Sequence, residues 1–470
     1  MAGALKFREI DSSVEGRAAL TRFYRGLYIA EFPDPHERES LVNMRRYLAL
    51  KAKGWYGPNN YHILIMELNG RPVGGSVFDY LARPNAGVIE FLFTRSTYRS
   101  RGFGKALLGA TLRALRRDAR ARTGRSLAAV VAEMNDPYRR MDTPDNMDPF
   151  ERAAIWGKWG FSKMEFPYVQ PALSPDQRPV RCLTLVAKPL RRVPRAGFGA
   201  DWALGVVGEY MRWAMRIRDP SRNAQYRDLA HFAAKNSRVR LVPLQTYVGR
   251  DPRKELRVEK IGPRHVAFRS LHRLLSSEIP FAGRVASIRE FESAFARGHR
   301  RVCRYHLWSV ARSGARHPEG LASFFTLTHA GFGGYIVLAS RLRGRGLLRP
   351  LIARIEEQMI KDQTPAEGWF IECDEGSMLP FVATGFREVP IEFRPPKVGG
   401  EPVRNGHPER LRLLYKPFGN PFDSKPLDLP FVLAGIADIL REIYEVPRPR
   451  KHECYRLAQQ TWKNPKTVLR

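Results

Sequence analysis

Two short glycine-containing segments have the residue types that bind phosphate. The first, Arg99-Ser100-Arg101-Gly102-Phe103-Gly104, follows an apolar β-like run and opens a helix-like one, and a similar segment begins at Arg341. Glycines at such a turn let the backbone approach an anion, and the first N–H groups of the helix point at it. We expect two phosphate sites, or one site and its relic. The expected contacts are Arg99, Arg101, Gly102, Phe103, Gly104 and Lys105, and Arg341, Arg343, Gly344, Arg345 and Gly346.

Two glutamates near the first segment are candidates for proton transfer. Glu90 interrupts the apolar run 88–92, and Glu133 ends the apolar run that follows the first helix. A carboxylate inside an apolar strand is partly desolvated, which raises its proton affinity and suits it to act as a base near neutral pH. The alternative for each is a structural pair with an arginine.

A concentration of acids follows Glu133 in a chain that is otherwise strongly basic. We expect this segment, with the loop that carries Glu31 and Asp34, to border a substrate site and to favour a cationic amine. In the alternative reading the acids form a solvated loop and pair with nearby arginines. The residues expected to bind substrate are Glu31, Asp34, Asp136 and Asp142, and Asp145 and Asp148 lie in the same segment.

Apolar periodicity places the first glycine segment in a mixed α/β domain. Residues 61–68 and 72–81 are β-rich runs joined at Asn69-Gly70, which predicts a hairpin. Residues 88–94 form the strand that leads to the glycines, and 105–122 has leucines at helical spacing. The other expected elements are strands at 5–10, 127–133, 166–170 and 180–187 and helices at 15–30, 37–51 and 149–159.

The second half repeats this order. A hairpin at 302–311 and 320–328 and a strand at 334–340 lead to the second glycine segment, and a helix follows at 347–361. A strand at 369–373 and a closing strand at 410–416 complete the pattern. Gly160-Phe161 and Gly385-Phe386 occupy equivalent places, as do Glu133 and Glu372.

This order of elements resembles the GNAT superfamily of acyl-CoA-dependent N-acyltransferases. In that family the motif R/Q-x-x-G-x-G/A, which Arg99, Gly102 and Gly104 match, holds the coenzyme A pyrophosphate through backbone amides. The resemblance implies a mixed α/β fold, a mostly antiparallel sheet flanked by helices, present as two tandem GNAT domains. The expected division is a catalytic N-terminal domain (1–190), a helical linker (191–239), a degenerate C-terminal domain (240–418) and a helix with a basic tail (419–470).

The resemblance also suggests roles for single residues. In many GNAT proteins an acid at the position of Glu90 is the base, and Glu133 is the second candidate. The tyrosine that often protonates the departing thiolate is replaced by Trp156 and Phe381, so Tyr168 or Tyr138 would have to substitute. The second half has no acid that matches Glu90, which leaves Glu372 or His329, and we therefore expect the chemistry in the first half.

Composition limits the partners. The 470 residues carry a formal net charge of +32, which favours an anionic partner, although arginine-rich usage in a GC-rich genome explains it equally well. The four cysteines are far apart and show no metal-ligand spacing, so neither a zinc site nor a disulfide framework is expected. No secretory signal or membrane-spanning run is apparent, and a cytoplasmic protein is expected.

Three functions remain open. The first is an acyltransferase that moves a group other than aminoacyl from acyl-CoA, such as acetyl-CoA, or from an acidic acyl carrier protein. Its acceptor would be a primary amine of an amino acid, a peptide or a natural-product intermediate. The second is a tRNA-linked acyl or aminoacyl transferase, which the basic segments 191–195, 235–253 and 448–451 would support. The third is a non-catalytic acyl-CoA sensor.

Overall fold

Two large β-sheets organise the chain, one in each of two units, Met1–Leu244 and Gln245–Arg470. The computed structural model describes residues 5–32, 38–139, 145–172, 177–194, 196–279, 286–297, 303–362, 364–396, 410–419 and 427–463. No helix in these ranges is long and apolar enough to cross a membrane. The predicted fold class, mixed and mostly antiparallel sheets flanked by helices, is confirmed.

The sheet of the first unit has eight strands among the described residues. They are β1 (Leu5–Glu9), β2 (Asn60–Leu68), β3 (Arg71–Leu81), β4 (Ala86–Thr94), β5 (Ala129–Asn135), β6 (Ser162–Met164), β7 (Leu183–Pro189) and β10 (Leu241–Pro243). Their spatial order is β1-β2-β3-β4-β5-β7-β6-β10, and only β4 and β5 run parallel to each other. A separate pair consists of β8 (Phe198–Gly199) and β9 (Arg238–Val239).

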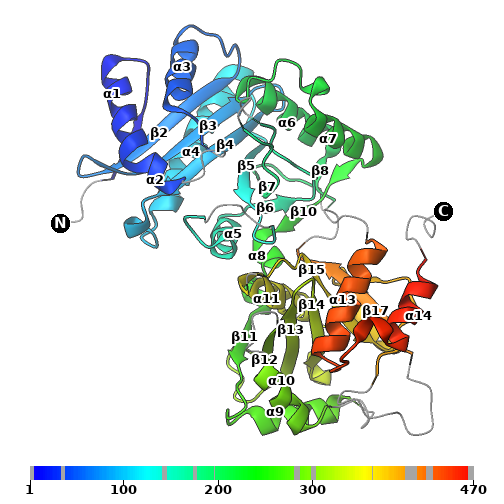
Figure 1. Cartoon of the computed structure of the whole chain (residues 1–470). Coiled ribbons are helices and arrows are strands. Elements are labelled where there is room, and N and C mark those ends of the chain that lie inside the picture. The colour runs from blue at the N-terminus through cyan, green and yellow to red at the C-terminus, as the bar shows by residue number, and fades with distance from the viewer. Residues whose placement is uncertain are drawn as a thin grey trace. The chain divides into compact units, whose positions relative to one another are not determined.

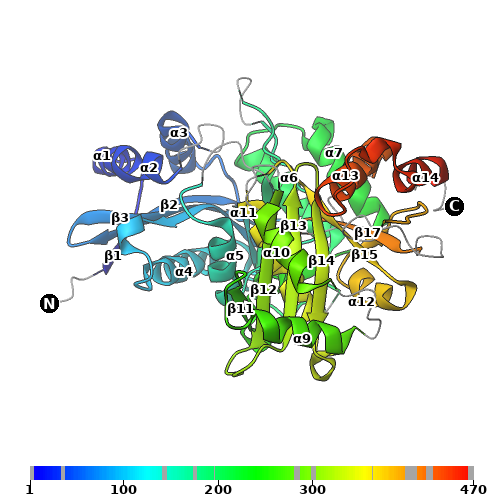
Figure 2. The ribbon, with the colours of Figure 1, turned by 60° about the horizontal axis from the view of Figure 1, so that its bottom comes forward.

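Helices cover both faces of this sheet. Figure 2 shows α1, α2 and α3 on one side of β2 and β3 and α4 on the other. The apolar side chains of α6 pack in one buried core with those of β5 and β7. The helices of the unit are α1 (Val14–Phe23), α2 (Ile29–Glu31), α3 (Leu41–Ala52), α4 (Phe103–Thr123), α5 (Pro149–Lys158), α6 (Ala200–Trp213) and α7 (Ala224–Lys235), and α8 (Leu244–Tyr247) begins at the boundary.

The parallel strands β4 and β5 separate halfway along their length. Their pairing ends at Ile89 and Ala132. Opposite β3, Phe78 pairs with Ile89 and Val77 pairs with Phe91, so Glu90 is the extra residue of a β-bulge. A bulge bends its strand and redirects a side chain. The fold therefore opens the sheet at the residue that interrupts the apolar run.

The second unit repeats the arrangement with seven described strands in the order β11-β12-β13-β14-β15-β17-β16. The strands are β11 (Leu256–Lys260), β12 (Cys303–Arg312), β13 (Gly320–Leu327), β14 (Gly331–Leu338), β15 (Gly368–Cys373), β16 (Arg387–Glu388) and β17 (Arg412–Pro417). The helices are α9 (Phe268–Glu278), α10 (Ile288–Arg297), α11 (Leu348–Lys361), α12 (Met378–Val382), α13 (Leu429–Glu442) and α14 (Glu453–Thr461), and Figure 1 shows α13 and α14 beside β17. The parallel pair β14 and β15 also ends early, and Gly334 is the bulged residue.

The repeat extends beyond the sheets. After α6, Arg216 has a left-handed backbone and a 3₁₀ turn at Pro220–Arg222 leads to α7; after α13, Glu445 and the 3₁₀ turn Pro449–Lys451 do the same before α14. The segment expected as a linker and the segment expected as a C-terminal helix are therefore equivalent parts of the two units.

One predicted strand is wrong. Residues 166–170 form no strand and contribute only an isolated bridge between Gln170 and Val180, while β6 lies earlier at Ser162–Met164. Pro167 lies within this segment and Pro171 directly follows it, and neither has the N–H group that a ladder requires.

Each unit contains a histidine–aspartate pair between its sheet and its long helix, buried in the first unit and half-buried in the second. His62 on β2 contacts Asp118 on α4 at 2.6 Å and Glu9 on β1 at 2.7 Å. In the second unit His306 contacts Asp362 at 2.8 Å. The hydrogen bond with His62 lowers the pKa of Glu9 well below its usual range. Burial alone would raise the pKa of Asp118, but the hydrogen bond and charge of His62 leave it lowered.

We expect His62→Gln to lower the stability of the first unit by about 2 kcal/mol at pH 7, because the buried Asp118 loses its hydrogen bond with His62 and keeps only the one from Asn60. A depressed carboxyl pKa stabilises the fold above the unfolded pKa, near 4, and this contribution disappears as the pH falls through the folded value. The deficit should therefore shrink below about pH 4. Scanning calorimetry from pH 3 to 8 measures it, with His265→Gln, at a more exposed pair, as the control.

Candidate active site

A cavity of about 840 Å³ lies in the first unit where β4 and β5 separate. Residues of both strands line it beyond their last paired position, including Glu90 and Glu133. The first turn of α4, the face of α5 and the end of α6 form the other walls. Backbone groups of β4 that face the gap have no β5 partner there, so an extended ligand can pair with them.

The first glycine segment forms one end of this cavity. Gly102 precedes α4 with φ +81°, no side chain caps this helix end, and a side-chain carbon added at Gly102 would meet only open space. The first helical hydrogen bond runs from Ala106 N to Gly102 O, so it uses none of the N–H groups of Phe103, Gly104 and Lys105. These three residues line the cavity. An uncapped helix N-terminus with these N–H groups fits a phosphate.

The arginines of this segment contribute differently from the glycines. Arg99 forms a 2.7 Å ion pair with Glu31, whose other oxygen accepts a hydrogen bond from Ser96 N at 3.3 Å. The Arg101 guanidinium lies 5.5 Å from the centre of the Tyr98 ring, and Arg101 does not line the cavity. Arg99 therefore fixes the loop through Glu31.

A contact of the same kind as Arg99 with Glu31 occurs in the second unit and corrects the alignment of the two glycine segments. In the second unit Arg343 pairs with Glu278 at 2.6 Å, and Ser340 N donates to the same carboxylate at 3.1 Å. Arg343, and not Arg341, is therefore the counterpart of Arg99. Arg341 pairs instead with Glu319 at 3.2 Å.

With this register the second glycine segment departs from the first at one position. Gly344 and Gly346 keep the left-handed conformation of Ser100 and Gly102. The residue that corresponds to Gly104 is Leu348, the first residue of α11. A side-chain carbon at Gly346 would lie 2.9 Å from Lys254 Nζ, so a lysine already occupies the space beside that glycine.

Glu90 shares its place at the bulge with a second acid, Asp79 on β3. Burial raises the pKa of Glu90 well above its usual range, and the adjacent Asp79 carboxyl raises it further. Burial also raises the pKa of Asp79, to about 6. Two neighbouring carboxyls that cannot both ionise freely share a proton, so this pair can exchange one near neutral pH.

Glu133 is held by two tyrosine hydroxyls. Tyr210 on α6 donates to it at 3.0 Å, and Tyr168 donates to its other oxygen. Burial raises the pKa of Glu133 to about 7, although both hydrogen bonds act to lower it. Tyr168, expected as a possible proton donor, is fully buried in this contact, whereas Tyr210 reaches the cavity wall.

The second unit keeps part of this chemistry. Glu372 corresponds to Glu133; Tyr444 donates to it at 2.5 Å, and burial raises its pKa to about 7. Phe393 lies as far after Gly385-Phe386 as Tyr168 lies after Gly160-Phe161, and the second Glu372 oxygen is buried with no hydrogen-bond partner among the described residues. Gly334 replaces Glu90 at the bulge. His329, the other expected candidate, pairs with Asp438 at 2.8 Å.

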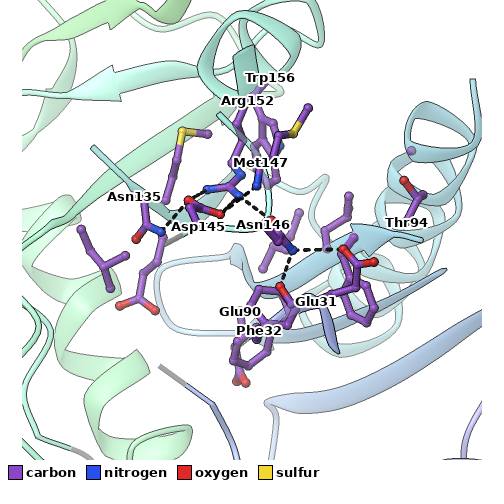
Figure 3. Close-up of a pocket in the computed structure, with 18 of the residues that line it drawn as sticks. Glu31, Phe32, Glu90, Thr94, Asn135, Asp145, Asn146, Met147, Arg152 and Trp156 are labelled. Carbon is purple, nitrogen blue, oxygen red and sulfur yellow. Dashed lines mark hydrogen bonds and ion pairs between the residues drawn. The ribbon is translucent and has the colours of Figure 1, made fainter. Parts of the chain in front are cut away.

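Of the four acids expected to bind substrate, the two that the structure describes are paired with neighbouring cations. Asp136 pairs with Lys163 at 2.5 Å and does not line the cavity. Glu31 lines the cavity but is held by Arg99 and by Asn146, whose amide nitrogen lies 3.0 Å from its carboxylate. Figure 3 shows this contact, and beside it Asp145 bound by Arg152 and Asn135. Asp34 and Asp142 lie outside the described residues.

Two residues of the site were missed by the sequence analysis. Asp79 carried a usable signal, because it interrupts the apolar run of β3 just as Glu90 interrupts β4. Tyr210 carried none, since it belongs to an apolar helix face in a segment expected to be a linker. Trp156 lies in the cavity wall, as does Trp159. Within the described ranges no cluster of three His, Cys, Asp or Glu side chains could hold a metal ion.

Comparison with known proteins places the first unit in context. The model of the acetyltransferase (GNAT) family matches residues 20–141. No curated protein sequence matches the chain.

Several of the solved structures that the chain matches are described as acetyltransferases. The ribosomal-protein-S18-alanine N-acetyltransferase of Escherichia coli is 13% identical, with a TM-score of 0.26 over 42% of this chain and 99% of its own. The PaiA N-acetyltransferase of Thermoplasma acidophilum, in complex with coenzyme A, is 10% identical, with a TM-score of 0.27 over 40% of this chain and 99% of its own. The IAA acetyltransferase of Bacillus cereus is 12% identical, with a TM-score of 0.25 over 40% of this chain and 100% of its own.

We expect Tyr210→Phe to raise the pKa of Glu133 from about 7 by roughly one unit. The Tyr210 hydroxyl stabilises the charged carboxylate, and the variant loses this hydrogen bond. Carbon-13 NMR of labelled glutamate side chains measures this value. Tyr226→Phe on α7 is the control, since Tyr226 makes no hydrogen bond to Glu133. An unchanged titration in Tyr210→Phe would show that the hydroxyl does not stabilise the carboxylate.

Proposed function

We propose that this chain, which carries an acetyltransferase domain of the GNAT family at residues 20–141, transfers an acyl group from an acyl-coenzyme A thioester to an amine. The observation that carries the proposal is the meeting of two features in one cavity. The uncapped start of α4 and the bulged Glu90 beside Asp79 both line or border the space where β4 and β5 separate.

The residues present fit coenzyme A. The N–H groups of Phe103, Gly104 and Lys105 would hold its pyrophosphate, and Gly102 leaves room for the phosphate oxygens. The unpaired edge of β4 beyond Ile89 offers backbone groups to an extended, amide-containing arm. When bound, this co-substrate supplies an acyl carbon that an amine can attack.

Glu90 then serves as the base. An amine attacks the thioester carbon, a C–N bond forms, the C–S bond breaks, and the nitrogen loses a proton that Glu90 accepts directly or through one water. Glu133, with a pKa of about 7 and a link to the cavity through Tyr210, can supply the proton that the departing thiolate takes up. No covalent enzyme intermediate is needed.

The first unit is the proposed catalytic unit. It has the carboxyl pair at the bulge, whereas the second unit has Gly334 there. The acceptor is proposed to be a primary amine of a small molecule or a peptide, and the acyl group is not an aminoacyl group.

We expect Glu90→Gln to lower kcat about 100-fold or more, because the nitrogen proton loses its acceptor. Thiol release from acetyl-CoA with a panel of amines measures this loss, and calorimetry with coenzyme A should show unchanged binding. Glu67→Gln, near the far end of β2, is the control.

Asp79→Asn should instead move the rising limb of kcat/KM to lower pH. Asp79 raises the pKa of Glu90, so its neutralisation lets Glu90 ionise at lower pH and makes the base available earlier. If the pH profile of this variant rises at the same pH as that of the parent, Glu90 and Asp79 do not share a proton.

A third change tests the proposed phosphate site at the start of α4, formed by Gly102, Phe103, Gly104 and Lys105 and called the phosphate cradle below. Gly102→Val should weaken coenzyme A binding at least about tenfold, because a branched side chain strains a left-handed position and blocks the approach of phosphate to α4. Gly124→Val carries the same strain at the other end of α4, where φ is +66°, and should bind coenzyme A normally. Equal binding by both variants would exclude the first cradle.

A further inference from the structure

The wall of the cavity away from the cradle is formed by α3 and the end of α6. Asn43, Arg46 and Tyr47 line it from one face of α3, at helical spacing. Met215 and Arg216 line it from the segment that follows α6. The Tyr47 hydroxyl joins the two walls by donating to the backbone oxygen of Ala214 at 2.8 Å.

Two guanidinium groups on this wall form no ion pair among the described residues, although the cavity-lining Glu39 carboxyl interacts with Arg216 at longer range. Arg46 and Arg216 are exposed to the cavity and form no ion pair within the described part of the chain. By contrast, Arg99 and Arg152, which also line the cavity, are each held by an acid. The free positive charge of the wall is therefore at its α3 and α6 end and at Lys105 in the cradle.

This end lies close to the proposed base. Burial raises the pKa of Tyr47, and the charges of Glu39, Glu90 and Arg216 all act on its hydroxyl. Burial also raises the pKa of Glu39, against the opposing effect of Arg216. Arg216 and Glu90 line the same cavity, so a group held by Arg216 lies in the space that Glu90 borders.

In the second unit the corresponding wall is held together by an ion pair. Glu445 occupies the position of Arg216, with the same left-handed backbone. Arg297, from the counterpart of α3, pairs with Glu445 at 2.8 Å and donates to the backbone oxygen of Glu442 at 2.9 Å. The first unit has the opposite charge at this position and joins the two walls through the Tyr47 hydroxyl rather than through an ion pair, which leaves Arg216 available to a ligand.

We propose that Arg46 and Arg216 bind a carboxylate of the acceptor, so that the preferred substrate is an amine that also carries a carboxylate, such as a free amino acid. The planar guanidinium matches a carboxylate in geometry and charge. This inference rests on the proposed function, because it names the acceptor of that reaction. It differs from the expectation of a cationic amine based on the acidic segment, whose described acids are largely paired.

The test compares acids with their amides. Free amino acids and the corresponding amino acid amides are offered with acetyl-CoA, and thiol release is followed. We expect the acids to be preferred, and Arg46→Gln and Arg216→Gln to raise KM for the acids about tenfold or more with a smaller change in kcat. Arg45→Gln and Arg218→Gln, exposed neighbours outside the cavity wall, are the matched controls. Equal use of acids and amides would overturn the proposal.

A second arm separates this proposal from the reaction itself. N-acetylglycine and N-acetylglycinamide are titrated into the full chain by calorimetry without a donor. If N-acetylglycine binds more tightly than its amide, and both arginine variants lose this preference, the carboxylate site is supported. This holds even if no amine releases thiol, because the failure to release thiol would overturn only the proposed function. No preference for the acid, or a preference kept in both variants, overturns the site.

A third arm asks which reactant brings the carboxylate. Malonyl-CoA and succinyl-CoA are compared with acetyl-CoA as donors. If the arginine variants raise KM for these donors and not for the amino acids, the carboxylate belongs to the acyl group and the assignment to the acceptor is overturned.

Discussion

The site depends on the point where two parallel strands stop pairing. β4 and β5 share a ladder only as far as Ile89 and Ala132, and the residues that line the cavity from these strands begin at that last pair and continue beyond it. A continuous ladder would consume the backbone groups and bury both glutamates in a closed sheet. The bulge adds one residue, Glu90, to β4 at the position where the two strands separate, so the same local irregularity both opens the sheet and places the glutamate.

Burial at this split has an electrostatic consequence. Carboxyls that are withdrawn from water but remain at a cavity wall hold protons near neutral pH, as Glu90 with Asp79 and Glu133 do. The hydroxyls of Tyr168 and Tyr210 satisfy Glu133 without giving it a countercharge. In the second unit the same strand position keeps a buried glutamate, while the bulge has no side chain, so the two halves have the same frame and different acids.

Sequence reasoning found the parts of the site that local patterns encode. Glu90 was visible because it interrupts an apolar strand, and the cradle was visible because glycines lie between a strand and a helix. The register of the second glycine segment was not, since arginines at positions 341, 343 and 345 allow more than one alignment and only the contact with Glu278 selects Arg343. Tyr210 lies 77 residues from Glu133, and no local pattern predicts that pairing.

The pair of helices that follows each sheet, α6 with α7 and α13 with α14, determines where a stable fragment of each unit must end. A fragment that ends at residue 190, where the first domain was expected to end, would lose the Tyr210 hydroxyl on Glu133 and the apolar face of α6 on the sheet. It would also expose the Tyr47 side of the cavity to solvent. The two copies inherited this cover together with the sheet, so fragments of either half should be cut after the second helix of the pair.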